Sequence, residues 1–201
     1  MYLRIKSSFI VVLFMTLVIL FILISINLFG MAFKKLGFPP EYSVYFLFLS
    51  LPGGYVNIPI KKIFSPVELK GSTSIAINVG GAVIPVIMSL FLSTMVSLVD
   101  VLIGIFIVTI LLNKIARPVK GSGIRIHALI PSMLASAIAL IISTQDAPMI
   151  AYISGTIGCL IGVDMLNLRK IPDMGVPVVS IGGAGTFDAI FLTGIISVLI
   201  S

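Results

Sequence analysis

The sequence is poor in charged residues, and it contains one cysteine, Cys159, and one histidine, His127. A lone cysteine excludes an intrachain disulfide, and without a Cys/His cluster the chain has no recognisable zinc site. His127 lies at the border of an apolar segment. We therefore expect it to be an interfacial residue rather than a metal ligand or a general base. We therefore predict no bound metal and no other cofactor.

Charged residues make up only 10% of the 201 residues, while 59% are hydrophobic. The mean hydropathy is +1.25. A soluble domain of this length needs far more polar surface to cover its core. Because one membrane span takes about 20 apolar residues, the chain has room for about seven spans and no soluble domain. We predict an all-α fold, in which residues 1–201 form one polytopic transmembrane helix bundle surrounded by the lipid bilayer.

The predicted spans cover residues 8–33, 42–60, 72–93, 95–112, 126–142, 148–168 and the segment after Pro177. Eleven of the 13 basic residues then fall on one side of the membrane, and only Lys34 and Lys35 fall on the other. Since basic loops remain in the cytoplasm, we predict a cell-membrane protein with its N-terminus cytoplasmic and its C-terminus outside. The basic residues of these loops account for the net charge of +6. The sequence has no basic stripe with interleaved aromatic residues, so we do not expect a nucleic-acid partner.

Helix-breaking residues interrupt three of the predicted spans. They are the clusters Pro52-Gly53-Gly54, Gly80-Gly81-Ala82 and Gly182-Gly183-Ala184-Gly185. Such breaks occur at membrane depth only where protein or a water-filled cavity satisfies the freed backbone groups. In the sixth span, Gly158 and Gly162 form a small-xxx-small pattern, which lets a neighbouring helix approach closely.

Two aspartates, Asp164 and Asp188, lie inside predicted spans. A charged side chain near the bilayer centre costs at least about 2.5–3.5 kcal/mol, so such residues usually face a bundle interior or a cavity. An interfacial ion pair with Arg169 or Lys170 is an alternative for Asp164. Asp188 is flanked on both sides by long uncharged stretches, which makes an interfacial position harder to accommodate.

The backbone before Asp188 decides whether the two carboxylates can meet. In a continuous helix from Pro177, Asp188 would lie roughly 16 Å into the membrane and Asp164 about 6 Å. If residues 177–185 are extended and the helix begins near Thr186, Asp188 falls in the first turn and can reach Asp164. Two close carboxyls share one proton, as an aspartyl hydrolase requires. The catalytic pair would be Asp164 and Asp188, with Gly183 and Gly185 allowing a substrate backbone to approach.

Several stretches of the chain resemble a known prokaryotic family of membrane proteins, catalogued as domain of unknown function 1614. The stretches are Tyr55-Val-Asn-Ile-Pro59, Asn78-Val-Gly-Gly-Ala82, Gly162-Val-Asp-Met-Leu-Asn167 and Ser180-Ile-Gly-Gly-Ala-Gly-Thr-Phe-Asp188. The resemblance implies a multi-pass membrane protein and supplies no activity.

A weaker similarity links the two aspartates to presenilin-type intramembrane aspartyl proteases. Those enzymes carry one aspartate in a Tyr-Asp pair and the second in a Gly-x-Gly-Asp motif on the next span. Here Asp164 follows Val163, and two residues separate Gly183-Ala184-Gly185 from Asp188. The similarity implies an enzyme that cleaves a membrane-embedded peptide.

Two other functions fit the same residues. In a cation- or proton-coupled transporter of small solutes, interrupted helices form a midplane site. Asp188 and Asp164 would then bind a small cation or relay protons, with Asn78 and Asn57 as neutral ligands. In a structural membrane subunit, the glycines would serve helix packing and the aspartates would form buried hydrogen bonds. The sequence leaves these alternatives open.

Overall fold

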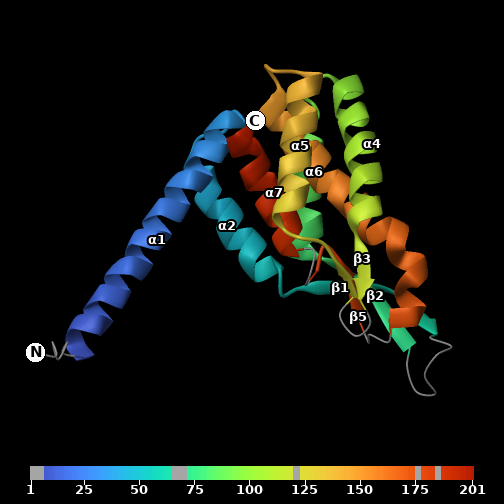
Figure 1. The fold of residues 1–201 in the computed structure, drawn as a ribbon, viewed down its shortest axis with the longest axis horizontal. Coiled ribbons are helices and arrows are strands. Elements are labelled where there is room, and N and C mark those ends of the chain that lie inside the picture. The colour runs from blue at the N-terminus through green and yellow to red at the C-terminus, as the bar shows by residue number, and fades with distance from the viewer. Residues whose placement is uncertain (1–6, 65–71, 120–122, 175–177, 184–186) are drawn as a thin grey trace, which may run out of the picture.

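The computed structural model describes residues 7–64, 72–119, 123–174, 178–183 and 187–201. Most of these residues are helical (Figure 1). The α-helices are α1 (Ser7–Lys35), α2 (Tyr42–Gly53), α3 (Ile84–Leu92), α4 (Leu98–Ile115), α5 (Leu129–Ile142), α6 (Ala147–Cys159) and α7 (Phe187–Ile200). Two π-helical turns, η1 (Val79–Val83) and η2 (Leu160–Asp164), and one 3₁₀ segment, η3 (Met165–Met174), adjoin them.

Helices α4, α5, α6 and α7 form the packed bundle, with α6 in contact with each of the other three. Small residues allow this close packing, as the small-xxx-small pattern predicts. Gly158 lies against Val108 of α4, and a Cβ on Gly162 would come within 2.5 Å of the Thr109 carbonyl oxygen. The α6 residues are consequently almost all buried, and the chain that follows α6 is held firmly against α4.

Helix α1 slants away from the bundle (Figure 1). Among the residues of α1 whose burial is described (14–35), the C-terminal part is the packed one, where Ala32 and Phe33 are buried, and Leu36 just after the helix is buried as well. There the Lys35 ammonium donates to the carbonyl oxygens of Leu199 (3.0 Å) and Ser201 (2.8 Å). This contact ties the end of α1 to the end of α7.

The expectation of a mainly helical fold is confirmed, but the fold is not all-α, because the described residues also form five short strands. Strands β1 (Asn57–Phe64), β2 (Ser72–Asn78) and β5 (Val178–Ile181) form a sheet in the order β1-β2-β5. The β1–β2 pairing is antiparallel and the β2–β5 pairing is parallel. Strands β3 (Arg117–Val119) and β4 (Gly123–Arg125) form a separate antiparallel pair. The sheet lies at one end of the bundle (Figure 1).

The strands replace parts of three predicted spans. The second span ends as a helix at Gly53 and continues as β1, and the third begins as β2. The segment after Pro177 includes β5 before α7. These strands are rich in isoleucine, valine, serine and threonine, and β-branched residues favour extended structure. A short apolar run of this kind fits a strand as well as a helix, so hydropathy alone does not separate the two.

Among the residues that the structure describes, three helical stretches are long and apolar enough to cross a membrane, namely Phe14–Lys35, Leu98–Ile115 and Ala147–Lys170. Four shorter apolar helices accompany them, at Tyr42–Gly53, Val79–Leu92, Leu129–Ile142 and Ile190–Ile200. A bundle of seven full spans is therefore not confirmed.

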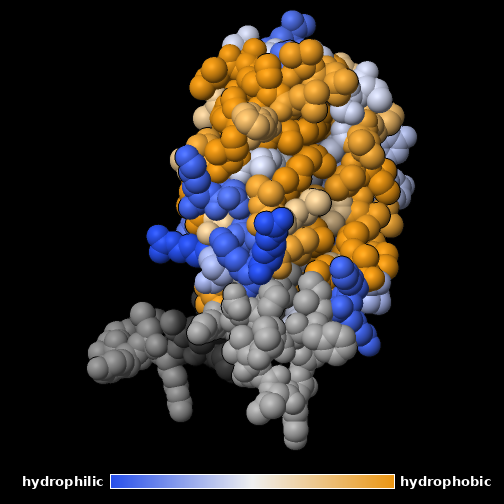
Figure 2. Space-filling model, turned by 90° about the vertical axis from the view of Figure 1, so that its right-hand side faces the viewer, coloured by the Kyte–Doolittle hydropathy of each residue, from blue (hydrophilic) through white to orange (hydrophobic). Residues whose placement is uncertain are grey.

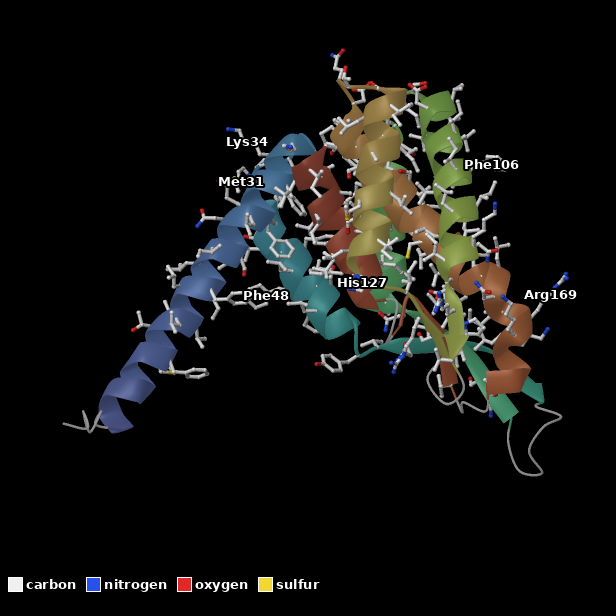
Figure 3. All side chains as sticks on the ribbon, in the orientation of Figure 1. Met31, Lys34, Phe48, Phe106, His127 and Arg169 are labelled. Carbon is white, nitrogen blue, oxygen red and sulfur yellow. The ribbon has the colours of Figure 1, made fainter. Side chains whose placement is uncertain are left out.

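The outer surface of the helices is strongly apolar. Figure 2 shows hydrophobic side chains over most of the visible helical face, with hydrophilic ones gathered toward the end that carries the sheet. Phe48 is 74% exposed and Phe106 is 67% exposed, and both point away from the bundle (Figure 3). Apolar patches of this extent mark a surface that faces lipid or another apolar partner. The apolar helices thus indicate a membrane protein.

Candidate functional site

The three predicted breaks meet at one place, which we term the glycine junction. It consists of Gly53, the last residue of α2, Gly54 after it, Gly80 and Gly81 in η1, and Gly182 after β5. A Cβ on Gly80 would lie 2.0 Å from the Ser50 carbonyl oxygen. Gly182 has a φ of +71°, and a Cβ on it would lie 2.6 Å from the Gly81 carbonyl carbon. The backbones touch directly, so only glycine fits at Gly80 and Gly182.

Two asparagines hold the junction together. The Asn78 amide nitrogen donates to the Gly54 carbonyl oxygen at 2.7 Å and to the Asn57 side-chain oxygen at 3.0 Å. The Asn78 side-chain oxygen accepts from the Gly81 N–H at 2.8 Å, which caps η1. The Ser180 hydroxyl donates to the same Asn57 oxygen. The structure therefore brings Asn57 and Asn78 together, with their oxygens already accepting protein donors.

Asp164 ends the π-helical turn η2 and is only 5% exposed. Its Oδ2 atom accepts a hydrogen bond of 2.6 Å from the Gly182 backbone N–H. A carboxylate that accepts from a backbone N–H makes one of the stronger hydrogen bonds in proteins. Lys170, one of the two interfacial partners considered for Asp164, donates its ammonium to the Asn167 side-chain oxygen at 2.7 Å. The carboxylate of Asp164 therefore lies at the glycine junction.

The described residues before Asp188 do not form a continuous helix from Pro177. Residues 178–181 are extended as β5, Gly183 donates its N–H to the Ser180 carbonyl oxygen, and α7 begins at Phe187. Asp188 is the second residue of α7, in its first turn, where the helix dipole favours a carboxylate. The Asp188 side chain and Gly185 lie outside the described residues.

Two further asparagines, which the sequence reasoning did not single out, support Asp164. The Asn113 amide of α4 donates to the Gly162 carbonyl oxygen at 2.9 Å. The Asn167 amide donates to the carbonyl oxygens of Gly162 (3.2 Å) and Val163 (2.9 Å). The sequence does contain a signal for these two residues, because an asparagine amide beside a membrane span needs a hydrogen-bond partner.

The chemistry available at the junction is that of carboxylates and amides. In the part of the chain that the structure describes, no three His, Cys, Asp or Glu side chains gather to hold a metal ion. Cys159 is buried in the span that leads to Asp164, and His127 is exposed just before α5 (Figure 3). A buried carboxylate beside a backbone turn can orient a water molecule, exchange a proton or attract a cation.

Comparison with known proteins identifies the family. The model of a family described as Protein of unknown function (DUF1614) matches residues 19–200, so the chain belongs to this family. This confirms the resemblance seen in the sequence motifs, whereas the similarity to presenilin-type proteases is not shown by the comparisons. No curated protein and no solved structure matches the chain.

Proposed function

We propose that this member of the DUF1614 family is a multi-pass membrane enzyme of the intramembrane aspartyl protease type, with Asp164 and Asp188 as its catalytic pair. One observation carries the proposal. The 2.6 Å hydrogen bond from Gly182 to Asp164 ties the end of η2 to the turn that leads into α7. Because α7 begins at Phe187, Asp188 lies in the first turn of that helix, six residues after Gly182 in the sequence.

The chemistry follows from two neighbouring carboxyls in a buried site. Like charges at short distance cannot both ionise, so the pair holds one proton. The ionised carboxylate takes a proton from water as the water attacks a peptide carbonyl carbon. The protonated carboxyl donates to the carbonyl oxygen as the tetrahedral intermediate forms. When the C–N bond breaks, the first carboxyl gives the proton it took from water to the leaving nitrogen, and the second carboxylate takes back the proton of a hydroxyl of the intermediate, which leaves a carboxylic acid and an amine.

A membrane-embedded peptide is the substrate class that the sheet supports. Strand β5 is at the edge of the sheet order β1-β2-β5, and Gly182, which bonds Asp164, follows it directly. An edge strand offers N–H and C=O groups to which an extended peptide can add. A peptide must be extended around the bond that is attacked. A peptide added to the edge of β5 would be extended and would lie beside Asp164.

A second candidate function is transport of a small solute coupled to a cation or protons. The convergence of three chain breaks at the glycine junction favours it, because interrupted helices commonly form a midplane site. Asp188 and Asp164 would bind the cation. The oxygens of Asn57 and Asn78 accept protein donors, so they are poor ligands unless the junction opens. This makes the transporter our second choice.

We also propose a cell-membrane orientation with the N-terminus cytoplasmic and the C-terminus outside. Lys61 and Lys62 belong to β1 of the sheet, whereas Lys34 and Lys35 end α1. Figure 3 shows Lys34 at the upper left of the molecule and Arg169 at the lower right. The C-terminal residue lies with Lys35, which donates to the Ser201 carbonyl oxygen. Basic segments remain in the cytoplasm, which places the sheet there. Labelling of single cysteines introduced at Lys62 and Thr94 in intact cells tests this orientation.

The activity is tested with purified protein in liposomes that contain single-span reporter peptides. Mass spectrometry identifies the fragments. We expect Asp164→Asn and Asp188→Asn each to abolish cleavage while the protein remains folded. Asp100→Asn is the matched control, because Asp100 lies in the first turn of α4, away from the junction, and should leave cleavage unchanged. Cleavage that persists in both junction variants contradicts the protease. Cation-dependent flux that is lost only in those two variants supports the transporter instead.

A further inference from the structure

We propose that Asn113 is a positioning residue for Asp164. By bonding the backbone of the π-helical turn η2, it keeps that turn wide and directs the Asp164 carboxylate toward Gly182. The proposal rests on the proposed function for its catalytic meaning, while the geometric role of Asn113 is measurable without any activity.

A π-helical turn leaves backbone groups without their usual helical partners. In η2 the Gly162 carbonyl oxygen accepts from the Asn113 amide at 2.9 Å and from the Asn167 amide at 3.2 Å. The Val163 carbonyl oxygen accepts from Asn167 at 2.9 Å. Two side-chain amides thus bond the carbonyl oxygens at the end of this turn. Single π turns inside α-helices frequently occur at functional sites.

Asn113 can reach this carbonyl because residue 162 is a glycine. Gly162 packs against the backbone of Thr109, one turn before Asn113 on α4, with no room for a Cβ. The close approach of α4 and α6 therefore presents the Gly162 carbonyl oxygen to the Asn113 amide. On the other side, the Lys170 ammonium donates to the Asn167 oxygen at 2.7 Å, which fixes the Asn167 amide with its nitrogen toward η2.

The π turn determines where Asp164 points. A π turn holds one more residue than an α-helical turn, and each residue corresponds to about 100° of rotation about the axis. If η2 relaxed to an α-helix, Asp164 would rotate by about 100° relative to α6. Its Oδ2 would then leave the Gly182 N–H, to which it lies at 2.6 Å. Asn113 opposes that relaxation, because its bond requires the Gly162 carbonyl to face α4.

The experiment measures amide hydrogen exchange of residues 178–183 by mass spectrometry, on the full chain in lipid nanodiscs. Asn113→Leu removes the amide with little change in volume, and Asn113→Gln keeps an amide. Asn27→Leu is the matched control, because Asn27 donates only to Leu23 of its own exposed helix. We expect exchange at Gly182 to rise about tenfold in Asn113→Leu, which corresponds to one lost hydrogen bond. It should stay near the wild-type rate in Asn113→Gln and Asn27→Leu.

If Asn113→Leu does not fold, Asn167→Leu removes the other amide and gives the same test. Peptide cleavage supplies the second readout, in which kcat should fall about 10²-fold in Asn113→Leu with KM nearly unchanged. Unchanged Gly182 exchange in a folded Asn113→Leu protein, or in Asn167→Leu where Asn113→Leu does not fold, overturns the proposal, whatever the activity. A rise in exchange in a protein whose wild type cleaves no peptide supports the positioning of Asp164 and rejects the protease.

Discussion

Replacing Gly80 by alanine tests the glycine junction most severely. The added Cβ would lie 2.0 Å from the Ser50 carbonyl oxygen, 2.4 Å from the Gly54 nitrogen and 2.8 Å from the Gly53 carbonyl carbon. All three atoms belong to the backbone, so no side chain can rotate away. The end of α2 and the turn η1 must therefore move apart.

The size of the effect follows from these contacts. Non-bonded heavy atoms in van der Waals contact lie about 3.5 Å apart, so the backbones of α2 and η1 must separate by about 1.5 Å. A shift of that size would also break the 2.7 Å bond from Asn78 to the Gly54 carbonyl oxygen. Overpacking costs about 1–3 kcal/mol and a lost hydrogen bond about 1 kcal/mol. We expect Gly80→Ala to lower the free energy of unfolding by about 2–4 kcal/mol.

The assay is reversible unfolding of the purified protein in detergent micelles with a denaturing detergent, followed by circular dichroism. Gly30→Ala is the control, because a Cβ there would meet only Pro40, at 3.4 Å and beyond. It should be neutral or stabilise the helix by about 0.5–1 kcal/mol. A Gly80→Ala protein as stable as the wild type would mean that α2 and η1 do not touch, and the junction would be refuted.

Three further predictions concern the same region. Gly162→Ala should lower the free energy of unfolding by about 1–3 kcal/mol in the same assay, because its Cβ would lie 2.5 Å from the Thr109 carbonyl oxygen. A Gly162→Ala protein as stable as the wild type would show that α4 and α6 are not this close. Asn78→Leu should lower the free energy of unfolding by about 1–3 kcal/mol, since it leaves the buried Gly81 N–H without its acceptor. The control Asn27→Leu should lower it by less than about 0.5 kcal/mol. Cys159 is free and buried, so a maleimide should label it only after denaturation, and rapid labelling of the folded protein would contradict the packing of α6.

The sequence predicted the positions of the helices because their signal is local. An apolar run of 18 residues, Leu98–Ile115, forms α4 nearly where it was expected. The breaks at Gly53, Gly80 and Gly182 were also predictable, since glycine clusters disfavour a helix wherever they occur. The start of α7 at Phe187 fits the case in which the helix begins after the glycine cluster rather than at Pro177.

The strands could not be predicted with the same ease, because their pairing is not local. Strand β2 pairs with β5, with Ile77 opposite Ile181. No pattern within either segment specifies a partner about a hundred residues away, and short apolar runs fit either structure. The support of Asp164 by Asn113 was missed for a related reason. The bond spans 49 residues and depends on a π turn that no periodicity in the sequence indicates.

The distance between the carboxyl carbons of Asp164 and Asp188 tests the central claim most directly. It can be measured in an experimental structure of the protein in lipid nanodiscs. The aspartate pair requires a separation below about 6 Å, at which the two groups share one proton. A separation beyond about 10 Å, with packed apolar side chains between the two groups, would contradict the proposed catalytic pair.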